Sequence, residues 1–189
     1  FSYVVNPFTA DAYFDFDLFK KHVAVAQRMM DDIIDLELEK IDTIIEKIDQ
    51  DPEEAEVKRI ERNLWIEIRK KADEGRRTGV GITAEGDMLA ALNIRYGSVE
   101  GNTFSEKIHK TLALAAYRSS VEMAKERGAF AIYDAKRELN NPFALRIKDA
   151  DPELYNDMQE YGRRNIALLT IAPTGSTSIL SQTTSGIEP

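Results

Sequence analysis

Residues 165–178 read NIALLTIAPTGSTS, and this stretch decides the fold class that the sequence predicts. Its section 166–172 is continuously apolar, with two arginines and an asparagine before it and Pro173 after it. A run that is apolar on both faces is typical of a central strand in a parallel sheet whose faces are covered by helices. We therefore expect a buried strand at about 166–172, in a protein of the α/β class.

The polar half of the stretch, Pro173–Ser178, follows that strand directly, and Ile179–Gln182 resembles the opening of a helix. A glycine lets the backbone turn tightly, and N–H groups and hydroxyls at a helix start can converge on an anion. The loop is not a Walker loop, because no lysine follows and the glycine spacing differs. A capped turn without a ligand explains the same residues, and the spacing alone leaves both interpretations open.

Upstream, the sequence predicts a short strand and a helical hairpin over about 15–74. Residues 1–5 are β-branched or aromatic, and Asn6-Pro7 ends them. Asp15 can cap a helix whose apolar spacing continues to the break at 49–52. A second amphipathic helix at about 53–74 should return antiparallel to it. Its expected apolar face consists of Val57, Ile60, Leu64 and Ile68.

The next part, about 83–161, is also expected to be helical. A glycine-rich turn leads to a short helix at 84–93, with Thr83 as its cap. A long helix at about 104–127 follows the loop at 97–103, and its apolar middle, 111–117, should be deeply buried. Shorter helical pieces should follow at about 134–139, 142–148 and 152–161.

Composition narrows the class of protein. The 189 residues suffice for one domain, and 43% hydrophobic against 31% charged residues can form a core. A net charge of -8 argues against a nucleic-acid partner. No signal peptide and no apolar run of about 20 residues is found, and cysteine is absent, so we expect a cytoplasmic protein. Because the chain starts without Met inside a strand-like run, we expect a segment of a longer protein.

Asp31-Asp32-Ile33-Ile34-Asp35 matches the DDxxD pattern by which isoprenoid synthases hold magnesium diphosphate. On a helical wheel, at about 100° per residue, the three aspartates point away from Met30 and its apolar neighbours. No second aspartate-rich motif is found. The pattern therefore favours a solvated face over a metal site.

Other motifs favour structural roles. Glu106 and His109 have the Glu-x-x-His spacing of di-iron bundles, but such a site needs a second copy and two more glutamates. Gly79, Gly81 and Gly86 are spaced wrongly for a dinucleotide fingerprint and should permit close packing. The arginine pairs at 76–77 and 163–164 should neutralise carboxylates or cap carbonyls.

Several stretches together resemble one family, the ribonucleotide reductases. Residues 165–178 and 184–189 are similar to the phosphate-binding strand and loop of their large chains. Residues 75–83 and 117–130 look like the helical half of their barrel, and 1–8 like the strand after a cysteine loop. The long hairpin and the Pro-Thr-Gly form of the loop resemble the adenosylcobalamin-dependent branch, class II.

The resemblance implies that residues 1–189 are part of a single ten-stranded α/β barrel domain. A central finger loop of that barrel carries a thiyl-radical cysteine, and the reaction replaces the ribose 2′-hydroxyl by hydrogen. The match assigns substrate phosphate binding to this segment, but no catalytic residue and no metal. The residues assigned to phosphate binding are Thr174, Gly175, Ser176, Thr177 and Ser178.

The expected cofactor of the full-length enzyme is adenosylcobalamin, and the expected substrate is a ribonucleoside di- or triphosphate. Nucleotide effectors and a thioredoxin-type reductant would bind elsewhere in that enzyme, which could form a homodimer. Two other functions stay open from the residues alone: an isoprenoid-synthase-like enzyme using Asp31 to Asp35, and a non-catalytic helical scaffold.

Overall fold

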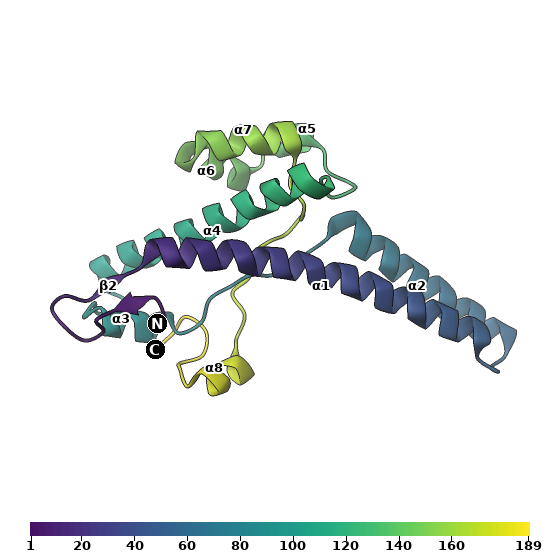
Figure 1. Ribbon diagram of the computed structural model, residues 1–189, viewed down its shortest axis with the longest axis horizontal. Helices are drawn as coiled ribbons and strands as arrows, with labels where there is room; N and C mark the ends of the chain where they lie inside the picture. The colour runs from purple at the N-terminus through teal and green to yellow at the C-terminus, as the bar shows by residue number, and fades with distance from the viewer. The chain divides into compact units, whose positions relative to one another are not determined.

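The computed structural model describes residues 1–189 and is mostly helical (Figure 1). In chain order its elements are β1 (Val4–Val5), β2 (Tyr13–Phe14), α1 (Phe16–Gln50), α2 (Ala55–Gly75), α3 (Glu85–Ala91), α4 (Val99–Arg127), α5 (Ala135–Glu138), α6 (Pro142–Ala150), α7 (Pro152–Tyr161) and α8 (Gly175–Ser181). No helix is long and apolar enough to cross a membrane.

The chain divides into two compact units. The first contains residues 1–26, 79–117 and 169–189, and the second contains 27–78 and 118–168. The expected barrel strands are largely absent, since the only sheet is β1 paired antiparallel with β2. The predominance of helix is confirmed, whereas the ten-stranded barrel stays an expectation.

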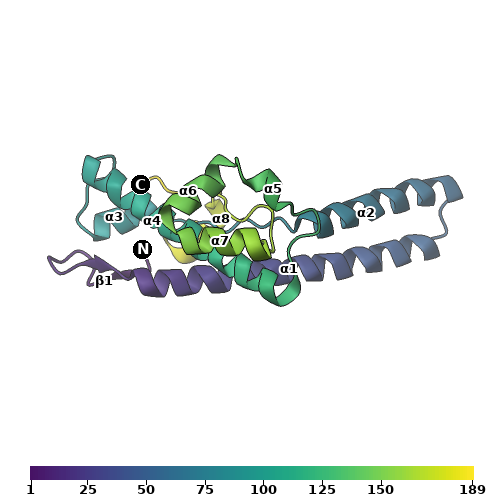
Figure 2. The ribbon, with the colours of Figure 1, turned by 90° about the horizontal axis from the view of Figure 1, so that it is seen from above.

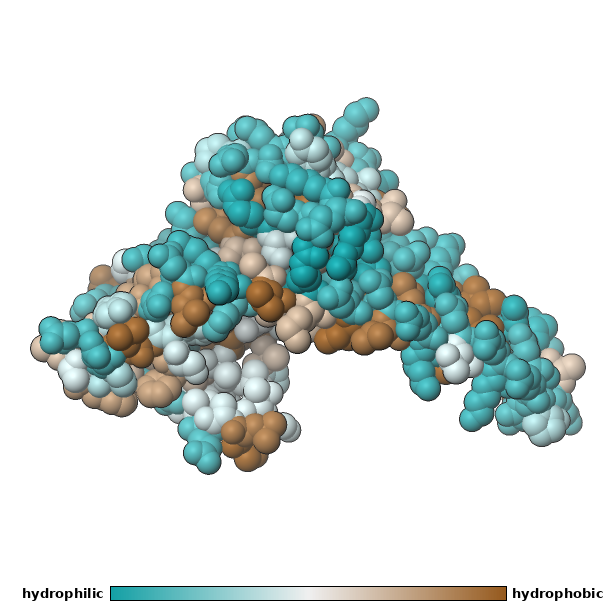
Figure 3. All heavy atoms as spheres, viewed as in Figure 1, coloured by the Kyte–Doolittle hydropathy of each residue, from teal (hydrophilic) through white to brown (hydrophobic).

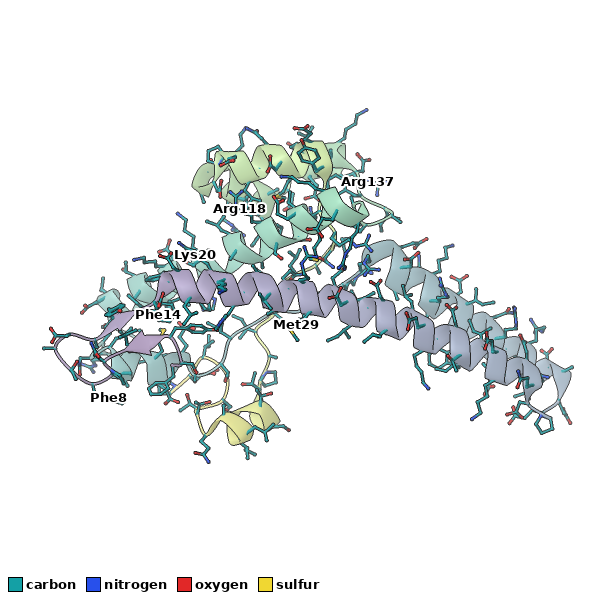
Figure 4. All side chains as sticks on the ribbon, viewed as in Figure 1. Phe8, Phe14, Lys20, Met29, Arg118 and Arg137 are labelled. Atoms are coloured by element: carbon teal, nitrogen blue, oxygen red, sulfur yellow. The ribbon has the colours of Figure 1, made fainter.

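An aromatic cluster forms part of the core of the first unit. Phe14 lies on β2 (Figure 4). Its ring centroid is 4.9 Å from that of Phe16 and 5.4 Å from that of Phe19, and Phe104 of α4 also contacts it. Tyr3 completes the cluster 5.0 Å from Phe19. The expected strand at 1–5 is shorter than predicted, because only Val4 and Val5 pair with β2.

The long helical hairpin is confirmed. Asp15 caps α1 as expected, accepting a hydrogen bond of 2.9 Å from the Leu18 N–H. The helix ends at Gln50, before Pro52, and α2 returns antiparallel to α1 (Figure 2). Proline has no N–H and disfavours a helical residue before it, which explains the break.

The expected apolar face of α2 is not buried against α1. Val57, Ile60 and Leu64 are 41–58% exposed. Ion pairs join the two helices instead, Arg69 to Asp42 at 2.6 Å and Arg62 to Asp49 at 3.2 Å. Hydrophobic residues are accordingly visible on the surface of the hairpin (Figure 3). The spacing predicted that these residues share one face of α2, but that face is exposed.

Most remaining helices lie close to their expected ranges, with two corrections. The α4 helix begins at Val99, inside the predicted loop, because Ser98 accepts a hydrogen bond from the Gly101 N–H at 3.0 Å and caps it there. Its middle is less buried than expected: Leu112 and Ala116 are buried, but the residues around them are half-buried. The fully buried residues of α4 lie further along the helix, at Ser120, Val121 and Met123.

The expected buried strand at 166–172 is the main correction to the predicted fold. Its pairing is parallel and comprises one isolated bridge, Val80 with Leu169, together with a few backbone hydrogen bonds, such as that from the Thr170 N–H to the Val80 carbonyl at 3.1 Å. Leu168 is buried, whereas Ile171 is 58% exposed. A central strand needs a hydrogen-bonded neighbour on each side, and this segment has one on a single side.

Two glycines allow the close approach that this bridge requires. A Cβ on Gly79 would lie 3.1 Å from Cγ2 of Thr170, and a Cβ on Gly81 would collide with the Thr170 carbonyl oxygen. The expectation of close packing is therefore confirmed. The partner is the extended segment at Thr170 rather than a helix.

Candidate functional site

The segment Thr174–Ser178 lies at the start of α8 in the first unit. The helix begins at Gly175, four residues earlier than the sequence suggested. Its first intrahelical hydrogen bond is donated by the Ser178 N–H to the Thr174 carbonyl, at 2.8 Å. The N–H groups of the first turn before it have no intrahelical acceptor. The residues that carry these N–H groups, Gly175, Ser176 and Thr177, are exposed.

The five expected phosphate-binding residues fall into two groups. Ser178 is buried, and its hydroxyl donates to the Gly175 carbonyl at 2.8 Å. The Thr174 hydroxyl accepts from the Gly186 N–H at 2.7 Å and is hydrogen-bonded to Thr83 at 2.9 Å. The hydroxyls of Ser176 and Thr177 make no such internal bond. Thr174 and Ser178 therefore shape the loop, and the three residues between them present its outer surface.

Gly175 has free space around it. A Cβ built there would meet no atom within 4 Å, and its backbone is not left-handed. Neither packing nor conformation therefore requires glycine at this position. The glycine leaves the outer surface of the helix start open to an incoming group.

A hollow of about 520 Å³ adjoins the loop. Residues 171–173 line one side, and residues 184–186, Glu188 and Pro189 line the other, both within the first unit. Ile179 and Leu180 of α8 are 79% and 86% exposed, and hydrophobic atoms are visible on the surface where α8 lies (Figure 3). The loop therefore stands at an open surface.

Comparison with known proteins gives the family. The model of the ribonucleotide reductase barrel domain matches residues 2–189. This chain belongs to that family. Among curated relatives, the vitamin B12-dependent ribonucleoside-diphosphate reductase of Mycobacterium tuberculosis (strain CDC 1551 / Oshkosh) is 28% identical over 181 residues, which cover 95% of this chain and 20% of the relative.

Two further relatives agree. The vitamin B12-dependent ribonucleoside-diphosphate reductase of Thermoplasma acidophilum is 28% identical over 176 residues, covering 93% of this chain and 17% of its own length. The large subunit of the Variola virus enzyme is 27% identical over 195 residues, covering 100% of this chain and 22% of its own length. The chain thus spans about a fifth of the length of the relatives it matches.

In this ribonucleotide reductase segment Asp31 of the DDxxD motif does not lie on a solvated face, which corrects the sequence interpretation for that residue. Asp31 is fully buried, Asp35 is half-buried and Asp32 is exposed. The Asp31 carboxylate accepts hydrogen bonds from Arg76 at 2.8 Å and from Asn165 at 2.8 Å.

Two more arginines contact that carboxylate, Arg164 at 3.3 Å and Arg127 at 3.4 Å. Burial works against ionisation of Asp31, but the hydrogen bonds and charges of Arg76, Asn165 and Arg164 outweigh it and hold its pKa below the ordinary value. The three carboxylates lie close enough to hold a cation. Arginines already neutralise them, so the isoprenoid-synthase alternative is not supported.

Three of the four paired arginines, Arg76, Arg163 and Arg164, have the structural roles that the sequence predicted, whereas the role of the exposed Arg77 stays a prediction. Arg76 bonds Asp31 and also Asp35, at 2.8 Å each. Arg163 is buried and donates to Glu138 at 3.1 Å and to the Asn165 carbonyl at 3.1 Å. Besides its contact with Asp31, Arg164 donates to the carbonyl of Gly128, after the end of α4, at 3.1 Å. These contacts assign the arginines to neutralising carboxylates and capping carbonyls.

Glu106 of the incomplete di-iron pattern is exposed, whereas His109 is half-buried. His109 contacts Glu85, with Nε2 at 2.9 Å from a carboxylate oxygen, and Ser105 donates to the other oxygen. The hydrogen bond to Glu85 raises the pKa of His109. Burial opposes ionisation of Glu85, but its bonds to His109 and Ser105 lower its pKa overall. No local pattern predicts this pair, since the partners lie 24 residues apart.

These shifts predict a pH-dependent contribution to stability. A raised folded-state pKa of His109 stabilises the fold below the ordinary pKa of histidine, about 6.5, and that contribution is lost as pH rises through the raised value. The lowered pKa of Glu85 means that its ionised form also stabilises the fold. That stabilisation is lost as pH falls through the lowered pKa of Glu85.

His109→Gln should therefore destabilise the full-length enzyme by roughly 1 kcal/mol near pH 6 and by less near pH 9. Thermal unfolding at the two pH values measures the difference, with His22→Gln as the control because the exposed His22 lies beside the Tyr3 ring and not in an ion pair. An equal loss at both pH values would contradict the account.

Proposed function

We propose that this chain is the part of a class II ribonucleotide reductase that holds the phosphates of the substrate. The observation that carries the proposal is the family match over residues 2–189, together with the vitamin B12-dependent relatives. The two units would then be parts of a single barrel domain. The full-length enzyme would reduce a ribonucleotide to the 2′-deoxyribonucleotide by thiyl-radical chemistry.

The role of this segment is binding and orientation. Phosphate oxygens would accept hydrogen bonds from the exposed N–H groups of Gly175, Ser176 and Thr177 and from the hydroxyls of Ser176 and Thr177. Backbone N–H groups at a helix start favour an anion because they are unpaired and oriented together. Fixing the phosphates restricts the position of the ribose before the chemical step. The chain contains no cysteine, so the radical and reducing thiols belong to other parts of the enzyme.

Adenosylcobalamin is proposed as the cofactor of the full-length enzyme, where its cleavage would supply the radical. The residues present do not form its site. The hollow of about 520 Å³ beside the loop, and a second cavity of about 260 Å³ in the first unit, are the size of pockets for much smaller ligands. No step is therefore assigned to residues of this chain through the cobalamin.

The names of the relatives favour a ribonucleoside diphosphate as the substrate. Effector nucleotides, a thioredoxin-type reductant and a second subunit would contact other regions, and we place the enzyme in the cytoplasm. The family expectation also includes deoxyribonucleotide supply for DNA replication.

An assay of the full-length enzyme tests this function. With a ribonucleoside diphosphate, a dithiol reductant and adenosylcobalamin, we expect formation of the 2′-deoxynucleoside diphosphate, and no product without the cobalamin. Product formation that needs a separate radical subunit and ignores cobalamin would refute the cofactor class. No reduction of any ribonucleotide would refute the proposed reaction.

A further inference from the structure

The shape of the phosphate loop depends on residues outside it. Thr83, just before α3, places its hydroxyl 2.9 Å from that of Thr174 and 3.2 Å from the Thr184 carbonyl oxygen. All three residues belong to the first unit. The sequence suggested Thr83 as the cap of α3, but Ala84 occupies that position in a left-handed conformation, with φ of 61°, and makes no side-chain cap.

These contacts fix the direction of each hydrogen bond. A carbonyl oxygen can only accept, so the single hydroxyl hydrogen of Thr83 goes to Thr184. Thr83 must then accept from Thr174, whose hydrogen is used in that bond. The Thr174 oxygen in turn accepts from the Gly186 N–H at 2.7 Å. A directed chain of bonds therefore runs from Gly186 through Thr174 and Thr83 to Thr184.

The same region of α3 holds the segment after α8 at two further points. The Asp87 carboxylate accepts from the Thr184 N–H at 2.8 Å, and the Ala84 N–H donates to the Gly186 carbonyl at 3.0 Å. Gly86 lies so close to this segment that a Cβ would be 2.6 Å from the Cα of Pro189. Residues at the start of α3 thus hold both ends of the α8 loop in position through hydrogen bonds.

We propose that Thr83 and Asp87 are positioning residues for substrate phosphate binding, since they hold Thr174 and Thr184 and thereby orient the exposed N–H groups at the start of α8. The proposal rests on the proposed function of the loop. Neither residue would touch the phosphate. The Thr174 hydroxyl would not donate to it either, because its hydrogen is committed to Thr83.

Thr83→Val keeps the shape of the side chain and removes the hydroxyl, leaving Thr174 without an acceptor and the Thr184 carbonyl without a donor. Loss of these bonds should weaken binding of a ribonucleoside diphosphate by about tenfold to a hundredfold. The KM should rise by a similar factor, with kcat at saturation nearly unchanged. Thr83→Ser should restore binding, because it restores the hydroxyl.

The test is equilibrium binding of the diphosphate and of the matching nucleoside, without phosphates, to the full-length enzyme. The effect should be confined to the diphosphate. Thr43→Val is the matched control, since the Thr43 hydroxyl bonds only a carbonyl of its own helix, that of Glu39, at 3.1 Å. If Thr83→Val does not fold, Asp87→Ala against Asp87→Asn decides the same question, because Asn retains an acceptor for the Thr184 N–H.

Equal weakening for nucleoside and diphosphate, or no recovery in Thr83→Ser, would overturn the proposal. So would unchanged diphosphate binding in Thr83→Val while Gly175→Val is impaired, and in that case the phosphate loop itself would stand. If Gly175→Val also binds normally, the proposed function of the loop fails first. The two failures are therefore distinguishable.

Discussion

Asp31→Ala should lower the free energy of unfolding of the full-length enzyme by about 3–5 kcal/mol, the usual cost of removing one partner of a buried ion pair. Asp31 is fully buried, and Arg76, which donates to it, is 3% exposed. Without the carboxylate, Arg76 loses its buried counter-ion, and Arg127 and Arg164 lose a shared one. If Asp31 were a solvated residue, its replacement would hardly change the free energy of unfolding.

The neighbouring aspartate provides the control. Asp32 pairs with Arg127 at 2.7 Å, but its side chain is 51% exposed, so Asp32→Ala should cost no more than about 1 kcal/mol. Denaturant unfolding of both variants measures the difference. Equal, small losses would contradict the structural role of Asp31, and lost magnesium binding would restore the metal interpretation.

Gly175→Val should weaken substrate binding by at least about a hundredfold, because several charge-assisted bonds would be obstructed together. The branched side chain would occupy the space in front of the first-turn N–H groups. Since a Cβ there meets no protein atom within 4 Å, the substitution should leave the fold intact. Ser176→Ala removes one hydroxyl donor and should cost less, roughly 1–3 kcal/mol.

The sequence predicted the helices well because their signals are local. Asp15 as a cap, the break before Pro52 and the glycine after Arg127 each act within one turn of the chain. Gly128 has φ of +86°, a conformation that glycine adopts without strain. Such features are visible in a short window of residues.

The prediction that Asp31 is solvated was wrong because it assumed that only apolar residues form the buried face of α1. The true face passes through Val23, Gln27, Asp31, Ile34 and Leu38, all buried. Its spacing of three and four residues continues through two polar positions. The helical spacing alone, without regard to hydrophobicity, would have indicated that Gln27 and Asp31 lie on the buried face. Their partners could not be found, since Arg76 and Asn165 lie 45 and 134 residues away.

The loop at the start of α8 shows the same limit. The sequence located the turn and the helix start that follows it, but not the contacts that support them. Thr83 contacts Thr174 across 91 residues, and no local pattern predicts that pairing. Likewise, apolar character predicted a strand at 166–172, yet strand formation depends on neighbouring strands, and here a single parallel bridge forms.

The most direct test of the central claim, that the start of α8 binds the substrate's phosphates, is equilibrium binding to full-length Gly175→Val. A ribonucleoside diphosphate, the matching nucleoside and adenosylcobalamin would be measured against the parent enzyme. We expect the diphosphate to bind at least about a hundredfold more weakly, and the nucleoside and the cobalamin to bind as before. Unchanged diphosphate affinity in a folded Gly175→Val enzyme would contradict the account and remove the phosphate-binding role from this loop.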